Sequence, residues 1–307
     1  MRRLQRPPRE ERAQRRFAKG ARLCGGRLLL RRLRWDKLCR PTARDLTSKP
    51  SKRQTPLMEA WVQRQLIERQ MPMRGWPLMF QEWHHLLFLH WAMEPGAVQR
   101  TLPQGLQVDL FEGKAWIGVV PFFVKRIRPY RLPGFPPVSN FLELNFRTYV
   151  RDEHERPGIW FYSLDANQPL AVWGARIAFG LPYQHALTHA KLEDGWIDYR
   201  SRRRGKRFHC RYRPIGRSGQ AVLGSFEFFL VERYRLFALL AGGIRTSRVY
   251  HTPYQLSHVE TTERETGALF ELNGFEQPAR PPDHVIYSER VDVTIYGLER
   301  GLKKRCG

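Results

Sequence analysis

The stretch Phe141-Leu-Glu-Leu-Asn-Phe-Arg-Thr-Tyr-Val150 alternates apolar and polar side chains along its length. Successive side chains of a β-strand point to opposite faces, so the stretch predicts a strand with one apolar face. The other face would carry four hydrogen-bonding side chains, Glu143, Asn145, Arg147 and Tyr149. Such groups need water, a partner or a ligand. The stretch therefore predicts a β-sheet and also marks where a site should be sought.

Two interpretations of this polar face are open. An exposed sheet face would satisfy the four side chains with water and would need no function. A cavity lining is the other interpretation. Glu143 and Arg147 are four residues apart on one strand, which is about 13 Å and too far for a direct ion pair. Each must therefore find a partner elsewhere, and a polar barrel lumen would supply one.

The sequence on either side of this stretch indicates a β-rich domain over residues 76–300, with short apolar runs separated by Gly and Pro. Residues 106–111 and 114–124 predict a hairpin that turns at Glu112-Gly113. A strand is also expected over 158–164. Short helices are expected over residues 94–102, 169–179 and 225–234. The predicted class is α+β, a twisted antiparallel barrel or paired sheet with a few short helices.

The positive charge of the 307-residue chain is concentrated at its N-terminus. The formal net charge is +24, and residues 1–57 hold 19 Lys or Arg against four acidic residues, a local net charge of +15. Residues 1–54 show no helical or strand period and are predicted to be disordered. A helix over 55–75, opened by Thr55-Pro56, would lead into the domain, and 301–307 would form a basic tail.

Several classes of protein are disfavoured by the sequence. The four cysteines lack zinc-finger or disulfide-framework spacing, and no metal site or cofactor is expected. The histidines His84, His85 and His90 have no acidic companion at metal-ligand spacing and are expected to be core residues, with His84 and His90 on one strand face. No segment is apolar and long enough to span a membrane or to serve as a signal peptide, so a cytoplasmic location is expected.

Other polar residues stand out in the following segments. Ser163 and Asp165 lie at the end of a predicted strand, where an aspartate commonly caps a turn or helix. Arg176 is the one charge in an apolar helix, and it is expected to pair with Glu143 or Asp165 or to hold a ligand carboxylate. His251 precedes Pro253 at a strand end, where a cavity mouth could place it.

The chain resembles the DUF2071 family, also called YqjF-like. The resemblance is carried by motifs that occur in order between residues 76 and 298: His90-Trp91, Ala115-Trp-Ile-Gly-Val-Val-Pro121, the 141–150 stretch, Trp160-Phe-Tyr-Ser-Leu-Asp-Ala166, Ala175-Arg176 with Leu181-Pro-Tyr183, Glu232-Arg-Tyr234 and His251-Thr-Pro-Tyr254. This family is similar to acetoacetate decarboxylase, so the resemblance implies a closed β-barrel-like fold with an interior cavity.

One departure from the decarboxylase pattern removes its mechanism. The decarboxylase uses a Schiff-base lysine in a Gly-Phe-Pro-Lys-Lys run, and the matching run here is Gly180-Leu-Pro-Tyr-Gln184. Tyr183 therefore stands where the amine would be and cannot form an imine. Lys125 is the least implausible substitute lysine. Glu143 and Arg176 match an acidic and a basic position of the decarboxylase pocket.

These observations predict a small-molecule pocket for an organic acid or carbonyl compound. If the protein is an enzyme, the expected chemistry is proton transfer by Glu143, Tyr183 or His251. Asn145, Arg147, Tyr149, Ser163, Asp165 and Arg176 would bind the ligand. The alternative is a non-enzymatic or nucleic-acid-associated protein that acts through residues 1–57 and the basic segment 199–213. That segment also fits the solvent face of a hairpin turning at Gly205. A homo-oligomer is compatible with either function.

Overall fold

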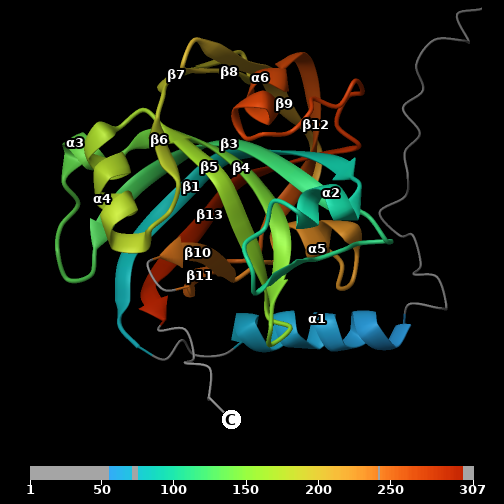
Figure 1. Ribbon diagram of the computed structural model, residues 1–307. Coiled ribbons are helices and arrows are strands. Elements are labelled where there is room, and N and C mark those ends of the chain that lie inside the picture. Colours follow the sequence, from blue (N-terminus) through green and yellow to red (C-terminus); the bar gives the residue numbers. More distant parts are fainter. Residues whose placement is uncertain (1–54, 71–74, 241–242, 300–307) are drawn as a thin grey trace, which may run out of the picture. The chain divides into compact units, whose positions relative to one another are not determined.

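The computed structural model describes residues 55–70, 75–240 and 243–299. Its centre is a closed barrel of seven strands (Figure 1), in which the ring is completed by pairing between the first and the last of them. In order around the ring, the strands are β1 (Pro77–Met93), β3 (Ala115–Pro129), β4 (Phe141–Asp152), β5 (Pro157–Ala166), β10 (Arg235–Leu240), β11 (Gly243–His251) and β13 (His284–Glu299). All neighbours pair antiparallel except β5 and β10, which are parallel. The barrel expected from the sequence is confirmed, with mixed rather than purely antiparallel pairing.

Six further strands extend this sheet. Four of them follow one another outward from β13: β12 (Gln255–Glu265), β9 (Lys206–Gln220), β8 (Trp196–Arg203) and β7 (Leu187–Glu193). Two short strands, β2 (Leu106–Val108) and β6 (Tyr183–His185), pair with β4 and β5 respectively. The outer strands fold back over the barrel wall, since the hydroxyl of Tyr199 on β8 donates to the backbone oxygen of Glu143 on β4 at 2.8 Å.

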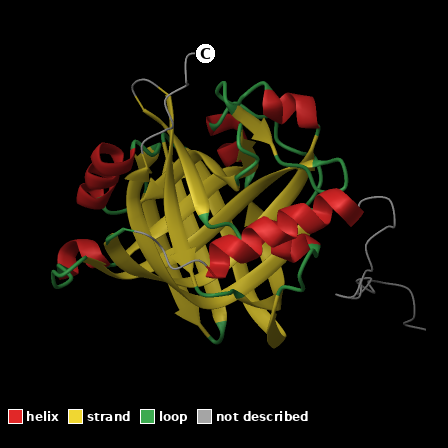
Figure 2. Cartoon of the chain, turned by 90° about the horizontal axis from the view of Figure 1, so that it is seen from below, coloured by secondary structure: helices red, strands yellow, loops and turns green. Residues whose placement is uncertain are grey.

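The described ranges contain six helices, and they lie around the strands of the barrel (Figure 2). They are α1 (Thr55–Gln70), α2 (Pro95–Gln99), α3 (Pro136–Ser139), α4 (Pro169–Phe179), α5 (Phe226–Val231) and α6 (Gly267–Leu272). The rings of Trp61 on α1 and Phe229 on α5 lie 5.6 Å apart, so α1 packs against the inner core. Among these helices, none has the length and apolar content needed to cross a membrane.

The wall of the barrel separates two apolar cores, and both faces of β4 are buried for this reason. Phe141 and Tyr149 belong to the inner core, with side chains from β1, β3 and β13. Leu144 and Phe146 belong to the outer core, between the barrel and the β8–β9 layer. The face of β4 that carries Glu143, Asn145, Arg147 and Tyr149 therefore points into the barrel.

The local elements follow from turn and capping residues. Gly180 ends α4 in the left-handed conformation, at φ +63°, where a Cβ is disfavoured. Glu112 and Gly113 both have positive φ in the turn before β3, as predicted. The predicted hairpin pairing is wrong, however, because β2 pairs with β4 and only Phe111 and Lys114 bridge across the turn.

A β-bulge at His85 changes which residues of β1 point into the barrel: the alternation before the bulge is opposite to that after it. His85 has φ +54°, and the pairing of β1 with β3 shifts register between His84 and Leu89. His84 bonds Glu82 on the outside at 3.0 Å, whereas His90 is fully buried near Tyr149 inside the barrel. The expectation that His84 and His90 share a face is therefore wrong, because the bulge inserts a residue between them.

The basic segment forms the predicted hairpin. Strands β8 and β9 turn at Arg204 and Gly205, both with positive φ, and Arg202 and Arg207 face solvent. Two arginines lie over the ring of Trp196, Arg211 at 4.9 Å and Arg213 at 4.6 Å. The basic extension 1–54 and the tail 301–307 lie outside the described residues.

Candidate functional site

The polar row of β4 is withdrawn from solvent inside the barrel. Glu143, Asn145, Arg147 and Tyr149 are all buried, and none is more than 8% exposed. The exposed-face interpretation of these residues is therefore wrong. Buried polar groups are normally hydrogen-bonded, but Asn145 Oδ1 and Arg147 Nε have no partner among the described residues. The barrel thus holds hydrogen-bonding capacity that the protein itself does not use.

Burial raises the pKa of two side chains in this row, Glu143 and Tyr149. The hydroxyl of Tyr183 donates to Glu143 Oε2 at 3.0 Å, and Asn145 also bonds the carboxyl group. Burial, with a smaller contribution from the nearby Asp165, raises the pKa of Glu143 to about 8 despite these two hydrogen bonds. Burial therefore favours the protonated form of Glu143, which has a proton to give.

Arg147 is a buried cation without a carboxylate partner among the described residues. Its guanidinium lies 5.5 Å from the ring centre of Phe88 and 5.7 Å from that of Tyr149. Asp109, a buried acid, is already paired with Arg233 at 2.6 Å. An isolated charge in such surroundings is costly, so Arg147 is suited to an anionic ligand.

Gly118 leaves space for the side chains of His90, Arg147 and Tyr149. It lies between His90 on β1 and Arg147 on β4 in the pairing register. A Cβ at this position would lie 3.3 Å from the His90 ring, 3.4 Å from Arg147 Cγ and 3.4 Å from the Tyr149 hydroxyl. Glycine in the interior of a strand commonly marks such a close approach.

Tyr183 is brought to Glu143 by the turn after α4. Its strand β6 pairs in parallel with β5, and Arg176 Nε donates to the Tyr183 backbone oxygen at 2.6 Å. The Arg176 side chain is exposed and forms no ion pair with Glu143 or Asp165. The expected pairing of Arg176 with a buried carboxylate is therefore wrong. Its head group bonds the backbone that carries Tyr183.

Ser163 and Asp165 belong to a buried cluster on the outer side of β5. Arg203 on β8 donates from Nε to Asp165 at 2.9 Å and from Nη2 to Ser163 at 3.4 Å. Burial raises the pKa of Asp165 to about 6, against the lowering effect of Arg203. The helix cap expected from Asp165 is supplied instead by Gln168, whose side chain accepts from the Leu170 N–H. The structure thus separates these two residues from the row on β4.

His251 is buried and stacked on the ring of Tyr234, with centroids 4.5 Å apart. Its two ring nitrogens face backbone oxygens, Thr252 at 2.9 Å and Arg233 at 3.3 Å. Burial lowers its pKa. No contact joins His251 to Glu143 or Tyr183 in the described part of the chain, so the three predicted catalytic residues do not form one cluster.

No described lysine lies on the inner face of the barrel. Lys125 is on the same side of β3 as Phe123, and its ammonium lies 5.8 Å from that ring. Lys114, Lys191 and Lys206 are exposed. The described residues also contain no group of three or more His, Cys, Asp or Glu that could hold a metal ion.

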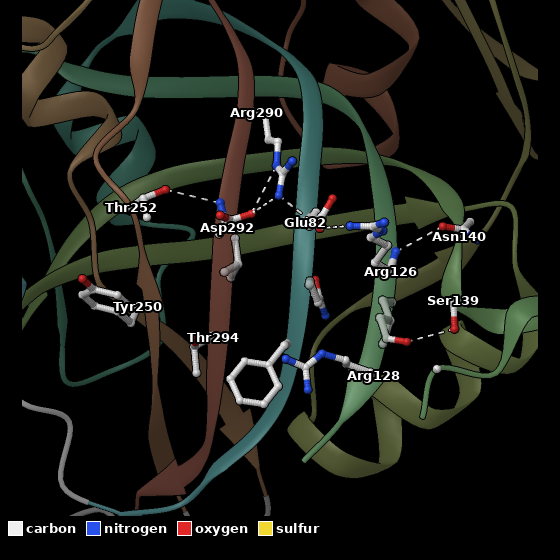
Figure 3. A pocket seen from close by; sticks show the side chains of 15 residues that line it. Glu82, Arg126, Arg128, Ser139, Asn140, Tyr250, Thr252, Arg290, Asp292 and Thr294 are labelled. Carbon is white, nitrogen blue, oxygen red and sulfur yellow. Dashed lines mark hydrogen bonds and ion pairs between the residues drawn. The ribbon is translucent and has the colours of Figure 1, made fainter. Parts of the chain in front are cut away.

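A groove of about 660 Å³ lies on the outside of the barrel, and none of the residues predicted from the sequence lines it (Figure 3). Its charged side chains are mostly paired with one another. Glu82 accepts from Arg126 and Arg290, each at 3.1 Å, and Arg290 also bonds Asp292 at 2.8 Å. Arg128 lies 4.2 Å from the ring centre of Phe80.

Residues 80–292 match the sequence model of the DUF2071 family, described as an uncharacterized conserved protein. The chain is 34% identical over 226 residues to the protein YqjF of Bacillus subtilis (strain 168), a match that covers 73% of this chain and 92% of YqjF.

Among solved structures, the enduracididine biosynthesis enzyme MppR is similar in fold. Its complex with the condensation product of pyruvate and imidazole 4-carboxaldehyde has a TM-score of 0.54 and 15% identity, over 73% of this chain and 90% of MppR. The acetoacetate decarboxylase of Legionella pneumophila has a TM-score of 0.50 and 15% identity, over 76% of this chain and 94% of that protein. At this identity the likeness concerns the fold.

Proposed function

The chain belongs to the DUF2071 family, and on this premise we propose that its barrel binds a small organic acid or carbonyl compound between Arg147 and Glu143. The observation that carries the proposal is the buried guanidinium of Arg147, which has no carboxylate partner in the described ranges and an unpaired Nε. A ligand carboxylate would supply both the missing charge and the missing hydrogen bond.

The ligand class is also supported by the structural relatives. MppR, which shares the fold, has been solved in complex with pyruvate, a 2-oxo acid. An acid of similar size would place its carboxylate on Arg147, while Asn145 and Glu143 lie further along the same strand face. The unpaired Asn145 Oδ1 could then accept a hydrogen bond from the ligand.

The chemistry proposed for this site is proton transfer without an imine. Glu143 keeps its proton at neutral pH because burial raises its pKa to about 8, so it can donate to a ligand carbonyl or enolate oxygen. Tyr183 holds the Glu143 carboxyl in place through a 3.0 Å hydrogen bond. By the resemblance of the run Gly180–Gln184 to the decarboxylase motif, Tyr183 stands where the lysine would be, and it has no amine to offer.

Titration calorimetry with pyruvate and acetoacetate tests this function. A hydrogen bond to a charged group contributes about 1.5–3 kcal/mol, so Arg147→Met should weaken binding roughly 10- to 100-fold. Arg128→Met in the outer groove is the matched control and should leave binding unchanged. Equal affinity in the Arg147→Met variant and the unaltered protein would contradict the proposal. Borohydride treatment with acetoacetate should leave no lysine-linked adduct.

A further inference from the structure

Four titratable side chains form a continuous line from the interior of the barrel towards its surface. The Tyr149 hydroxyl lies 2.7 Å from His90 Nε2. His90 Nδ1 lies 3.4 Å from Nδ1 of His284, and His284 Nε2 lies 3.5 Å from Glu227 Oε1. The four residues come from β4, β1, β13 and α5, so only the folded barrel brings them together.

Exposure increases along this line in one direction. Tyr149 and His90 are fully buried, whereas the side chains of His284 and Glu227 are 16% and 18% exposed. The ring of Phe88 stacks on His90, and Phe226 meets His284 edge-on at 5.0 Å. Glu227 is therefore the end that reaches solvent, and aromatic rings flank the two histidines.

The hydrogen bonds must follow one order when both imidazoles are neutral. The pKa of Glu227 is lowered, because hydrogen bonding from His284 and from backbone outweighs the effect of burial. Its carboxylate can only accept, so His284 carries its proton on Nε2 and has a bare Nδ1. His90 must then donate from Nδ1 and accept at Nε2 from the Tyr149 hydroxyl. Every donor thus points towards Glu227.

The charged groups around the buried end favour a neutral His90. Arg147 from β4 and His284 from β13 face it, and Arg233 lies near Tyr149. Burial, with the positive charge of Arg147 and that of His284 when it is protonated, holds the pKa of His90 well below its usual value. A neutral imidazole can accept a proton on one nitrogen while it releases one from the other.

We propose that Tyr149, His90, His284 and Glu227 form a proton relay between solvent and the acid site at Arg147. The inference rests on the proposed function for the identity of the proton donor. A C–H bond beside the carbonyl group of the bound acid breaks, its proton goes to the Tyr149 oxygen, and its electron pair forms the enolate whose oxygen Glu143 protonates. As the Tyr149 oxygen takes this proton, its own proton passes to His90 Nε2. The Nδ1 proton of His90 then moves to His284 Nδ1, and the Nε2 proton of His284 moves to the Glu227 carboxylate. Each intermediate group gains one proton and loses one, and Glu227 releases the proton to water.

The tautomer of His90 provides the test, read from the ¹⁵N shifts of its ring in the ligand-free protein. With His284 neutral, His90 should be protonated on Nδ1. When His284 is protonated on both nitrogens, its Nδ1 becomes a donor towards His90 Nδ1. His90 should then carry its own proton on Nε2. The His90→Gln and His284→Gln variants assign the signals. As His284 becomes protonated, the proton of His90 should move from Nδ1 to Nε2, and the ¹⁵N shifts of the two nitrogens should change places.

Glu227→Gln removes the anion that fixes the order and should leave His90 in a mixture of tautomers. Glu289→Gln is the matched control, since Glu289 bonds His85 at 3.3 Å outside the relay, and it should leave His90 unchanged. The relay is overturned if His90 keeps the same protonated nitrogen throughout the titration of His284, or if the two variants behave alike. Because no ligand is present, this failure is distinct from a failure of carboxylate binding at Arg147.

Discussion

The inner face of β4 and the outer groove each contain glutamate and arginine side chains, but in opposite surroundings. Inside, Glu143 and Arg147 are each at most 8% exposed and do not pair with each other. Outside, Glu82 binds two arginines, and the side chains of Arg126 and Arg290 are 75% and 47% exposed. In the groove the charges largely satisfy one another, whereas on the inner face Arg147 has no carboxylate partner among the described residues, and its Nε and Asn145 Oδ1 are unpaired there.

This difference is the reason why we propose the binding site on the inner face and not in the groove: the inner face has hydrogen-bonding groups that the described residues leave unpaired. Exposed ion pairs are weak because water solvates both partners. Buried charges without partners are costly and persist where something else stabilises them. The two regions should therefore respond very differently to equivalent substitutions and to pH.

The largest contrast is expected in the pH dependence of stability. The folded-state pKa of Glu143 is about 8, above its ordinary value of 4.5, so the unfolded chain loses this proton first as the pH rises. Stability from this group should fall between pH 4.5 and 8, by up to about 5 kcal/mol. Urea unfolding at pH 5, 7 and 8.5 should show this fall, and Glu143→Gln should remove it.

Glu82→Gln in the groove is the control for that experiment. Hydrogen bonds from His84 and Arg126 outweigh burial and lower the pKa of Glu82, so its contribution should have the opposite sign and be lost as the pH falls below 4.5. An unchanged pH profile in the Glu143→Gln protein would show that Glu143 titrates normally.

The second contrast concerns ion pairs of equal chemistry. Asp109→Asn leaves Arg233, whose side chain is 1% exposed, without its carboxylate, and should cost about 3–4 kcal/mol of unfolding free energy. Asp292→Asn in the groove breaks a pair whose side chains are both more than 40% exposed. It should cost less than about 1 kcal/mol in the same denaturant titration. Similar losses would remove the distinction between the two regions.

A smaller effect is expected at Gly118. Gly118→Ala should push apart His90, Arg147 and Tyr149, reduce stability by about 1–2 kcal/mol and weaken carboxylate binding. Gly174→Ala, in helix α4 with no atom within 4 Å of the added Cβ, should instead stabilise the protein by about 0.5–1 kcal/mol. Thermal unfolding and calorimetry on the two variants measure both effects. Unchanged binding in Gly118→Ala would place the ligand elsewhere.

The smallest effect is expected for Arg126→Ala. Its side chain is 75% exposed and its pair with Glu82 is shared with Arg290, so the unfolding free energy should change by less than about 0.5 kcal/mol. Carboxylate binding should be unaffected. A measurable loss of binding would indicate that the ligand binds in the groove and not in the barrel interior.

Much of the architecture was predictable because local signals agreed with it. Alternation over 141–150 gave the direction of each side chain on β4, and Pro169 with Gly180 bounded α4. The burial of both faces of β4 was not visible in the sequence, since it depends on a second layer of strands contributed by residues 187–220 and 255–265.

Other features depend on contacts far apart in the chain. The bulge at His85 changes which residues before it on β1 face the barrel interior, and no Gly, Pro or other turn residue at this position predicts it. Arg203 resembled its exposed neighbours but points inward to Asp165. His90 and Gly118 became candidate site residues only when β1, β3 and β4 were brought into register. A glycine in an apolar run was the one available signal.

The most direct test of the central claim is a crystal structure of the protein soaked with pyruvate. The account predicts density for the acid inside the barrel, with its carboxylate on the Arg147 guanidinium, Glu143 nearby and no covalent bond to a lysine. The same soak of the Arg147→Met protein should leave that position without the acid. Pyruvate bound at Arg128 in the outer groove, with the Arg147 region unchanged, would contradict the account.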